Sequence, residues 1–247
     1  MKRLLLLLTL IGCVSTQPQT TFHETKLREI DAAVELAIAN KKIPGGVFWI
    51  ERDGVAVHRA YGNRALVPSV EAMSEETIVD AASLTKVTAT APAIWLLAER
   101  GKLSIDDPVA RYIPGVDPEI TIRHLLTHSS GLRPGLSLRE PWSGYENGIE
   151  LAVKETPVNR PGHIFRYSDV NYILLGEVVR VASGRPLHEF VREEIFQPLK
   201  MRDTGFLPKR SERIAPTELI PSPPTPVPAD GGERDEKQLM LRGVVHD

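Results

Sequence analysis

Residues 82–86 read Ala82-Ser83-Leu84-Thr85-Lys86, and the side chains at positions 83 and 86 decide how the rest of the chain is interpreted. Residues three apart on a helix share a face, so the Lys86 amine can reach the Ser83 hydroxyl and take its proton. A serine hydroxyl is a poor nucleophile until a base lies beside it, and a helix N-terminus favours developing negative charge. The pattern therefore predicts an activated serine, with a solvated Ser and Lys on a helix face as the alternative.

The helix that carries this pair is predicted over residues 83–100 and ends at Gly101, a residue that favours helix C-termini. Pro92 lies inside it, where a proline removes a backbone hydrogen bond or kinks the helix. Apolar residues recur at helical spacing upstream, which predicts an amphipathic helix over about 24–40. Further helical segments are expected near residues 105–112, 121–128, 147–155, 169–182 and 186–197.

Strand-forming residues are concentrated in one short region. Val47-Phe48-Trp49-Ile50 and Val55-Ala56-Val57 flank Asp53-Gly54, which predicts a β-hairpin. The first run is apolar on both faces, so we expect cover on both sides. A two-stranded hairpin alone is marginally stable in water, and little else in the chain has strand character. Either the hairpin packs wholly on helices, or its partner strands lie outside this sequence.

Composition excludes several classes of protein. The 247 residues are 42% hydrophobic and 25% charged, which is typical of a globular chain rather than a disordered one. The net charge of −2 provides no basic surplus for binding nucleic acid. A single cysteine excludes an intramolecular disulfide bond. We expect no nucleic-acid partner and no cofactor.

The first residues predict an export signal with a lipid attachment site. The basic Met1-Lys2-Arg3 precedes an apolar run from Leu4 to Ile11 that is too short to span a membrane. The quartet ending at Cys13 resembles the lipobox of bacterial lipoproteins, whose cysteine is lipidated. The alternative is an ordinary secretory signal with an incidental cysteine. We expect a signal peptide over 1–12, a tether over 13–24, and an exported protein held at the bacterial cell envelope, periplasmic or outer surface, only through this lipid anchor.

Two further blocks complete a pattern. The first is His124-Leu125-Leu126-Thr127-His128-Ser129-Ser130-Gly131-Leu132, and the second runs from Pro161-Gly162 to Tyr167-Ser168-Asp169-Val170-Asn171-Tyr172. With the serine block, in this order and at these separations, the chain resembles the serine β-lactamase and penicillin-binding protein family over roughly residues 25–247. It is most similar to class C enzymes, D-alanyl-D-alanine carboxypeptidases and related esterases.

The resemblance implies a β-lactamase-like serine hydrolase fold of the α/β (α+β) class, a helical region plus an antiparallel sheet of which only the N-terminal hairpin is present. It implies that Ser83 is the acylated nucleophile, that Lys86 accepts its proton, and that Tyr167 shares the proton relay and protonates the leaving group. The Ser83 N–H would form half of an oxyanion hole. Asp169 stands where the family usually has the Asn that binds the substrate's acyl side chain. An ionised carboxylate cannot donate hydrogen bonds, which argues against ordinary β-lactam turnover.

The implied activity is a serine hydrolase that forms an acyl-serine on a small-molecule or peptidoglycan-peptide substrate: a cell-wall peptide, a β-lactam or a carboxylic ester. The family's third motif, Lys-Thr-Gly or His-x-Gly, does not occur in the 247 residues. We therefore expect the domain over 25–247 to be incomplete at its C-terminus, with a Pro-rich loop over 221–232. The alternative is a non-catalytic peptidoglycan-binding protein or a degenerate, truncated relative.

His124 and His128 are four residues apart, a spacing that can bind zinc. The sequence lacks the Glu of a His-Glu-x-x-His motif and offers no obvious third ligand. We therefore expect no metal site, and the resemblance implies that this block is a helix end followed by a turn.

Overall fold

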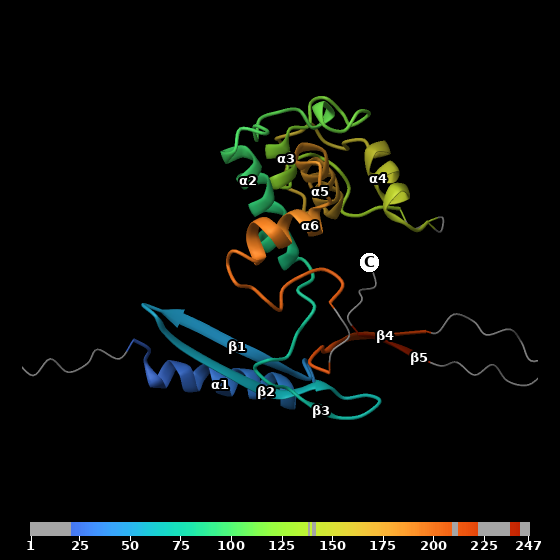
Figure 1. Ribbon diagram of the computed structural model, residues 1–247. Coiled ribbons are helices and arrows are strands. Elements are labelled where there is room, and N and C mark those ends of the chain that lie inside the picture. The colour runs from blue at the N-terminus through green and yellow to red at the C-terminus, as the bar shows by residue number, and fades with distance from the viewer. Residues whose placement is uncertain (1–20, 138, 140–141, 209–211, 222–237, 243–247) are drawn as a thin grey trace, which may run out of the picture. The chain divides into compact units, whose positions relative to one another are not determined.

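A computed structural model describes residues 21–137, 139, 142–208, 212–221 and 238–242 (Figure 1). It divides the chain into two units, of which one ends at Thr77 and the other begins at Ile78. The predicted signal peptide, Cys13 and most of the Pro-rich segment lie outside the described residues. Across the described part of the chain, no helix is both long enough and apolar enough to cross a membrane.

The first unit is a helix packed on an antiparallel sheet. Helix α1 spans Glu24–Ala39, and strands β1, β2 and β3 span Gly45–Arg52, Val55–Ala65 and Glu71–Ala72. The strand order is β1-β2-β3, so the predicted hairpin is confirmed. Its turn residues have positive φ angles of 53° and 76°, the backbone conformation that Asp-Gly favours in two-residue hairpin loops.

Polar contacts join α1 to one face of this sheet. Asp31 of α1 forms an ion pair with Arg59 and accepts a hydrogen bond of 2.5 Å from the Tyr61 hydroxyl. The Tyr61 hydroxyl and the Arg59 guanidinium hold the pKa of the Asp31 carboxyl below its ordinary value. The expectation that a helix covers the hairpin is confirmed for this face.

The second unit is mostly helical and begins with the serine block. Lys86–Thr90 form a π turn, η1, that continues directly into α2 at Ala91–Glu99, so the predicted helix is confirmed. The other helices are η2 (Val109–Arg111), α3 (Ile122–Leu126), α4 (Tyr145–Lys154), α5 (Asp169–Ser183), α6 (Leu187–Val191) and the π turn η3 (Arg192–Phe196).

The predicted helix over 105–112 is wrong, because only η2 is helical there. The Asp107 carboxylate accepts the backbone N–H of Ser104, which closes a turn where the helix was expected to begin. Pro108 has no N–H to donate, and it pairs with Thr121 as an isolated bridge instead.

Both π turns precede a proline by the same spacing. The turn at Lys86–Thr90 is closed by the Ala91 N–H bonding to the Lys86 carbonyl, and Pro92 follows. In the same way, the Gln197 N–H bonds to the Arg192 carbonyl before Pro198. A proline in a regular α-helix presses on the carbonyl four residues earlier, and a wider turn relieves that clash. This spacing accounts for a proline inside the helix that follows Ser83.

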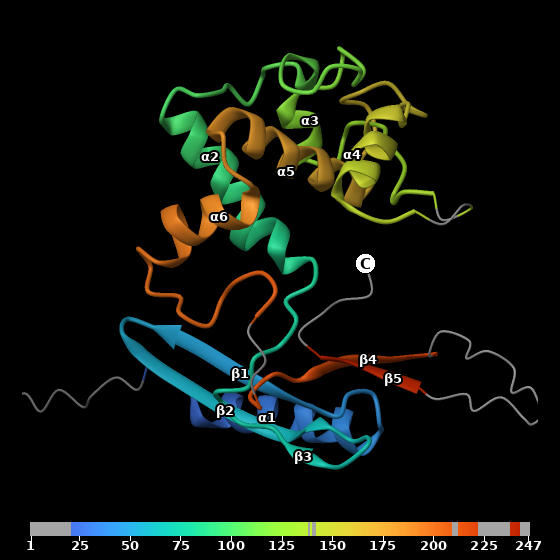
Figure 2. The ribbon, with the colours of Figure 1, turned by 45° about the vertical axis from the view of Figure 1, so that its right-hand side comes forward.

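Helix α5 is the centre of the second unit, where it contacts α2, α3, α4 and α6 (Figures 1 and 2). Its buried face packs with the inner face of α2 in a single apolar cluster. The fully buried members from these two helices are Ala93, Ile94, Val170, Leu174, Leu175, Val178 and Val179.

A second sheet corrects the expectation that the hairpin is the only strand structure. Strands β4 (Pro216–Pro221) and β5 (Gln238–Arg242) pair antiparallel, and Ile78 forms an isolated parallel bridge with Ile214. The sequence pattern missed β4 because prolines stand at both of its ends, where a strand tolerates them. It missed β3 because that strand has only two residues. Pro221, expected to open the Pro-rich loop, is the last residue of β4.

One buried carboxylate joins α4 to α5. Glu177 accepts two hydrogen bonds from Arg180, at 2.6 and 2.7 Å, and one from the Tyr145 hydroxyl. Burial alone would raise the pKa of Glu177, but the bonds from Arg180 and Tyr145 outweigh it and the net pKa is lowered. Burial and the same contact raise the pKa of Tyr145 to about 12.

Replacing Glu177 with Gln should lower the free energy of unfolding by about 1–2 kcal/mol at neutral pH, since charge-assisted hydrogen bonds are lost. Because the folded-state pKa of Glu177 is depressed, its stabilisation is present above the ordinary value of 4.5 and is lost as the pH falls through the folded-state pKa. The difference between the two proteins should therefore shrink in acid. Urea unfolding over a pH series measures it.

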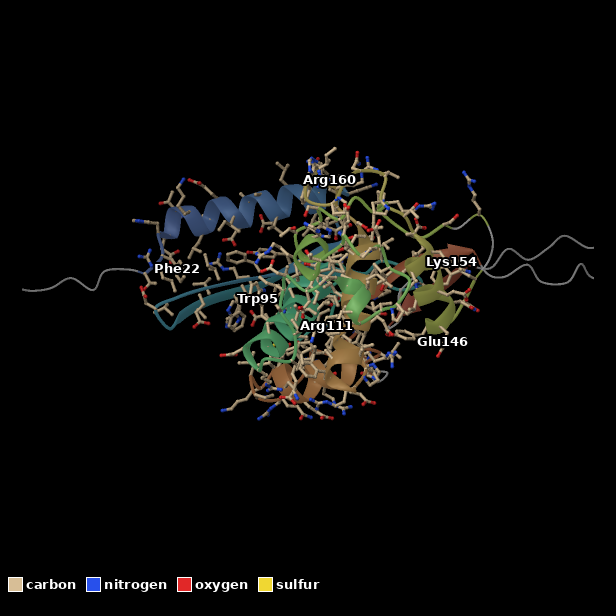
Figure 3. All side chains as sticks on the ribbon, turned by 90° about the horizontal axis from the view of Figure 1, so that it is seen from above. Phe22, Trp95, Arg111, Glu146, Lys154 and Arg160 are labelled. Atoms are coloured by element: carbon tan, nitrogen blue, oxygen red, sulfur yellow. The ribbon has the colours of Figure 1, made fainter. Side chains whose placement is uncertain are left out.

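The matched control is Glu150→Gln, which removes an exposed pair with Lys154. Glu146 and Lys154 mark this outer surface of α4 in Figure 3. The Lys154 ammonium lowers the pKa of Glu150, but solvent screens this exposed pair, so the control should differ little from the wild type across the pH series. A Glu177→Gln protein whose deficit persists unchanged in acid would contradict the assignment of the effect to this carboxylate's charge.

Candidate active site

Ser83 lies at the start of the helix formed by η1 and α2. The preceding residue, Ala82, has a φ of +42°, a strained conformation for a residue with a Cβ. The Asp80 carboxylate accepts the Ala82 N–H at 2.8 Å and holds this turn. Within the described residues no hydrogen bond to the Ser83 N–H is found, as an oxyanion donor requires.

Two side chains converge on the Ser83 hydroxyl oxygen. Lys86 Nζ lies 3.1 Å from Oγ, as the i, i+3 spacing predicted. The Tyr167 hydroxyl lies 2.7 Å from the same oxygen, although it is 84 residues away in the sequence. The structure therefore brings together the three residues expected to act on the scissile bond.

The Lys86 ammonium is enclosed by the start of α5 and by aromatic rings. Its Nζ lies 2.6 Å from Asp169 Oδ1, and 5.1 and 5.7 Å from the ring centroids of Tyr167 and Tyr172. Burial by itself would lower the pKa of Lys86, but the Asp169 carboxylate and the Tyr167 hydroxyl outweigh it, so the pKa is raised. Lys86 is therefore an ammonium at neutral pH.

Tyr167 has the opposite shift. Its hydrogen bonds with Ser83 and then Lys86 lower the pKa of the phenol below its ordinary value, since both contacts favour the phenolate. Tyr167 is 44% exposed as a residue and the Asp169 side chain is 56% exposed, so solvent reaches the group that can exchange protons with Ser83. The geometry allows proton transfer between Ser83 and Tyr167 beside a fixed positive charge.

The His124–Leu132 block forms a backbone support for the loop that carries Tyr167. Three main-chain hydrogen bonds of 2.8–2.9 Å join them, namely Val158 N–H to the Gly131 carbonyl, Gly162 N–H to the Ser129 carbonyl and Arg166 N–H to the His128 carbonyl. Gly131 approaches this loop most closely, because a Cβ there would meet the Asn159 carbonyl oxygen at 2.1 Å. The block therefore fixes the position of a loop rather than supplying a reacting group.

The same contacts start α5. Ser168 caps the helix by accepting the Asn171 N–H, and its hydroxyl donates to the Arg133 carbonyl at 2.6 Å. The Asp169 N–H donates to the Pro134 carbonyl at 2.6 Å. Asp169 is thus the first residue of α5, where the helix dipole favours its negative charge beside Lys86.

His124 and His128 serve separate local purposes. His124 and Thr121 form a capping box at the start of α3. His128 Nδ1 accepts the Ser168 N–H at 3.1 Å, and its ring contacts Tyr167 and Tyr172. The described residues contain no cluster of three or more His, Cys, Asp or Glu side chains that could hold a metal ion.

The structure brings the four predicted site residues, Ser83, Lys86, Tyr167 and Asp169, close together, and it adds two neighbours to which the sequence assigns no role in the site. These neighbours are His128 and Tyr172, whose rings lie beside Tyr167 and Lys86. The sequence does carry a signal for them, because three aromatic residues lie between Phe165 and Tyr172. If one of these rings contacts Ser83, its aromatic neighbours are expected to pack beside it.

The family follows from these blocks and from comparison with known proteins. The chain matches the Beta-lactamase family model over residues 30–239, which is most of its length, and it belongs to that family. Its mixed helix-and-sheet architecture is accordingly a β-lactamase-like fold.

The names of individual relatives describe several hydrolytic activities. Esterase EstB of Burkholderia gladioli is 34% identical to this chain in an alignment that covers 75% of it. A protein named putative D-alanyl-D-alanine carboxypeptidase, from Escherichia coli K12, is 30% identical in an alignment that covers 94% of it. The solved structure of EstCE1, a hydrolase with promiscuous acyltransferase activity, superposes with a TM-score of 0.69 at 25% identity, covering 87% of this chain and 64% of that one. The chain spans 53% and 59% of the lengths of the first two relatives.

Replacing Gly131 with Ala should lower the free energy of unfolding by at least about 2 kcal/mol, because the new Cβ collides with the Asn159 carbonyl at a φ of +80°. Gly135→Ala is the control, since an added Cβ there meets nothing within 4 Å. Thermal and urea unfolding of both variants measure the difference. Equal stabilities would contradict the close approach of these two loops.

Proposed function

We propose that the protein is a serine hydrolase that cleaves an ester or amide through an acyl-Ser83 intermediate. The observation that carries this proposal is the convergence on Ser83 Oγ of the Tyr167 hydroxyl at 2.7 Å and Lys86 Nζ at 3.1 Å. A nucleophile with a proton acceptor and a fixed cation within hydrogen-bond reach is the arrangement that acyl transfer requires. Relatives named as an esterase and a carboxypeptidase support the same class of reaction.

In the proposed acylation, Ser83 Oγ attacks the substrate carbonyl carbon while its proton passes to the Tyr167 phenolate. The tetrahedral intermediate collapses as the carbonyl carbon's bond to the leaving oxygen or nitrogen breaks, and Tyr167 gives the proton to that leaving group. Water then attacks the acyl-serine ester and gives a proton to Tyr167, and Ser83 recovers that proton as the carboxylic acid departs. The Ser83 N–H stabilises the oxyanion in both steps.

Tyr167 is a better proton acceptor than Lys86 in this site. The Asp169 carboxylate raises the pKa of Lys86, whereas the hydrogen bond with Ser83 and then the contact with Lys86 lower the pKa of Tyr167. We assign to Lys86 the role of an electrostatic anchor that stabilises the phenolate, and to Asp169 both the pairing of this ammonium and contact with the acyl side of the substrate. The ionised carboxylate favours substrates that carry hydrogen-bond donors there.

The substrate class that we propose comprises cell-wall peptides, β-lactams and carboxylic esters, with esters and peptides ahead of β-lactams because of Asp169. The N-terminal sequence supports an exported protein, held at the bacterial cell envelope by lipid on Cys13. No metal or cofactor takes part in the proposed reaction.

Covalent capture tests the nucleophile. The intact protein should gain the mass of a fluorophosphonate probe, and Ser83→Ala should gain none, since the attacking oxygen is gone. Ser104→Ala, which alters an exposed turn serine, should be labelled like the wild type. Intact-protein mass spectrometry measures the outcome.

Labelling of Ser83→Ala equal to that of the wild type would refute the assignment. If the wild type is not labelled, yet wild type and Ser83→Ala are both retained on peptidoglycan, the non-catalytic binding alternative is favoured instead.

A pH profile tests the electrostatic roles. The Asp169 charge raises the pKa of both Lys86 and Tyr167, so Asp169→Asn should lower both values. The rising limb of the labelling rate against pH should therefore move to lower pH, whichever group accepts the proton. Asp106→Asn, which removes an exposed pair with Arg123, should leave the limb in place. A limb that moves to higher pH in Asp169→Asn would contradict the proposed electrostatics.

A further inference from the structure

We propose that His128 is a positioning residue that holds the Tyr167 hydroxyl against Ser83. This inference deepens the proposed function and depends on it for the chemical role of Tyr167. The positioning itself is visible in hydrogen bonds, ring contacts and backbone conformation, which can be tested without turnover.

His128 is hydrogen-bonded to both sequence neighbours of Tyr167. Its carbonyl accepts the Arg166 N–H at 2.8 Å, and its Nδ1 accepts the Ser168 N–H at 3.1 Å. The two bonds lie on either side of the tyrosine along the chain, so they fix the backbone from which the phenol extends. His128 has a φ of +55°, a backbone conformation that Asn and His tolerate better than most residues.

The imidazole ring also fixes the tyrosine ring directly. Its centroid lies 4.5 Å from that of Tyr167 and 5.1 Å from that of Tyr172, with the planes tilted by 31° and 35°. Phe165 packs edge-on at 6.0 Å. Contacts of this geometry between aromatic rings are attractive and restrict ring movement. The phenol therefore has His128 against its ring and Ser83 at its hydroxyl.

The imidazole is neutral, which suits this role. Burial, and then the nearby Lys86 ammonium, lower the pKa of His128, against a smaller opposing effect of the Asp169 carboxylate. The Ser168 N–H donates to Nδ1, so the imidazole proton is on Nε2. A neutral ring keeps its acceptor toward the loop and adds no second positive charge beside Lys86.

His124 provides a matched control from the same block. Its Nδ1 also accepts a backbone N–H, that of Thr121 at 3.3 Å, and its ring lies near Gly162. It caps α3 and is not a ring neighbour of Tyr167. A substitution at this position therefore reproduces the loss of a half-buried imidazole that accepts a backbone N–H, without removing a ring contact of Tyr167.

The experiment compares His128→Asn, His128→Phe and His124→Asn in the intact protein. His128→Asn keeps an acceptor and tolerates the positive φ but loses the ring, whereas His128→Phe keeps a ring but loses the acceptor. The first readout is the pKa of the Tyr167 phenol, from carbon-13 NMR of Cζ-labelled tyrosine. The chain has five tyrosines, and Tyr167→Phe assigns the signal. The second readout is the rate of fluorophosphonate labelling.

Both His128 variants should move the Tyr167 pKa upward toward its ordinary value, because the phenol moves away from Ser83 and Lys86. Labelling should slow by about 10- to 100-fold, the range expected when a reacting group is displaced by an ångström. His124→Asn should change neither quantity.

An unchanged Tyr167 pKa in either His128 variant would overturn the positioning role, as would an equal change in His124→Asn. If the wild type shows no labelling but its Tyr167 pKa rises on substitution of His128, the hydrolase proposal fails and the positioning role stands. Because the two His128 variants remove different contacts, one that fails to fold leaves the other to decide.

Discussion

The packing of two helices against each other is the constraint on which the site depends. The helix that follows Ser83 and the helix that begins at Asp169 share one apolar core, and their N-termini meet at one place. Each N-terminus presents the positive end of a helix dipole, and Lys86 adds a full charge between them. This positive region favours the anions of the proposed reaction, a phenolate and an oxyanion, and the Asp169 carboxylate balances it. The electrostatics of the site therefore follow from the hydrophobic core rather than from separate local arrangements.

Main-chain and side-chain contacts make different contributions to holding the Tyr167 loop. Main-chain hydrogen bonds join the His124–Leu132 block to the loop that carries Tyr167. The two segments can approach closely enough for these bonds because Gly131 has no Cβ. Side chains then set the orientation, since the Ser168 hydroxyl caps α5 and the His128 ring contacts the phenol. A backbone framework of this kind permits variation among solvent-facing side chains such as Asp169 without moving Ser83, the proposed nucleophile.

The sequence predicted the parts of this structure that depend on neighbouring residues. The contact between Ser83 and Lys86 follows from helical spacing alone, and the hairpin follows from Asp53-Gly54. The place of Tyr167, 84 residues from Ser83, came only from resemblance to a family, because no local pattern encodes a contact at that separation. The helix over 105–112 was wrong because Asp107 and Pro108 together favour a turn. Strands β3 and β4 were missed because one is too short and the other too rich in proline for alternation to be visible.

The π turn after Ser83 sets how the serine is rotated relative to the buried face of its helix. A π turn adds one residue to a helix without lengthening its hydrogen-bonded core, and one residue corresponds to a rotation of about 100° around the axis. Deletion of one residue between Val87 and Thr90 would turn Ser83 away from Tyr167 relative to the buried face, and it would return Pro92 to a regular α-helix, where its ring presses on the carbonyl four residues earlier. The rotation of Ser83 relative to the buried face of this helix is therefore set by the extra residue of the π turn, so the spacing of this segment matters as well as its residue types.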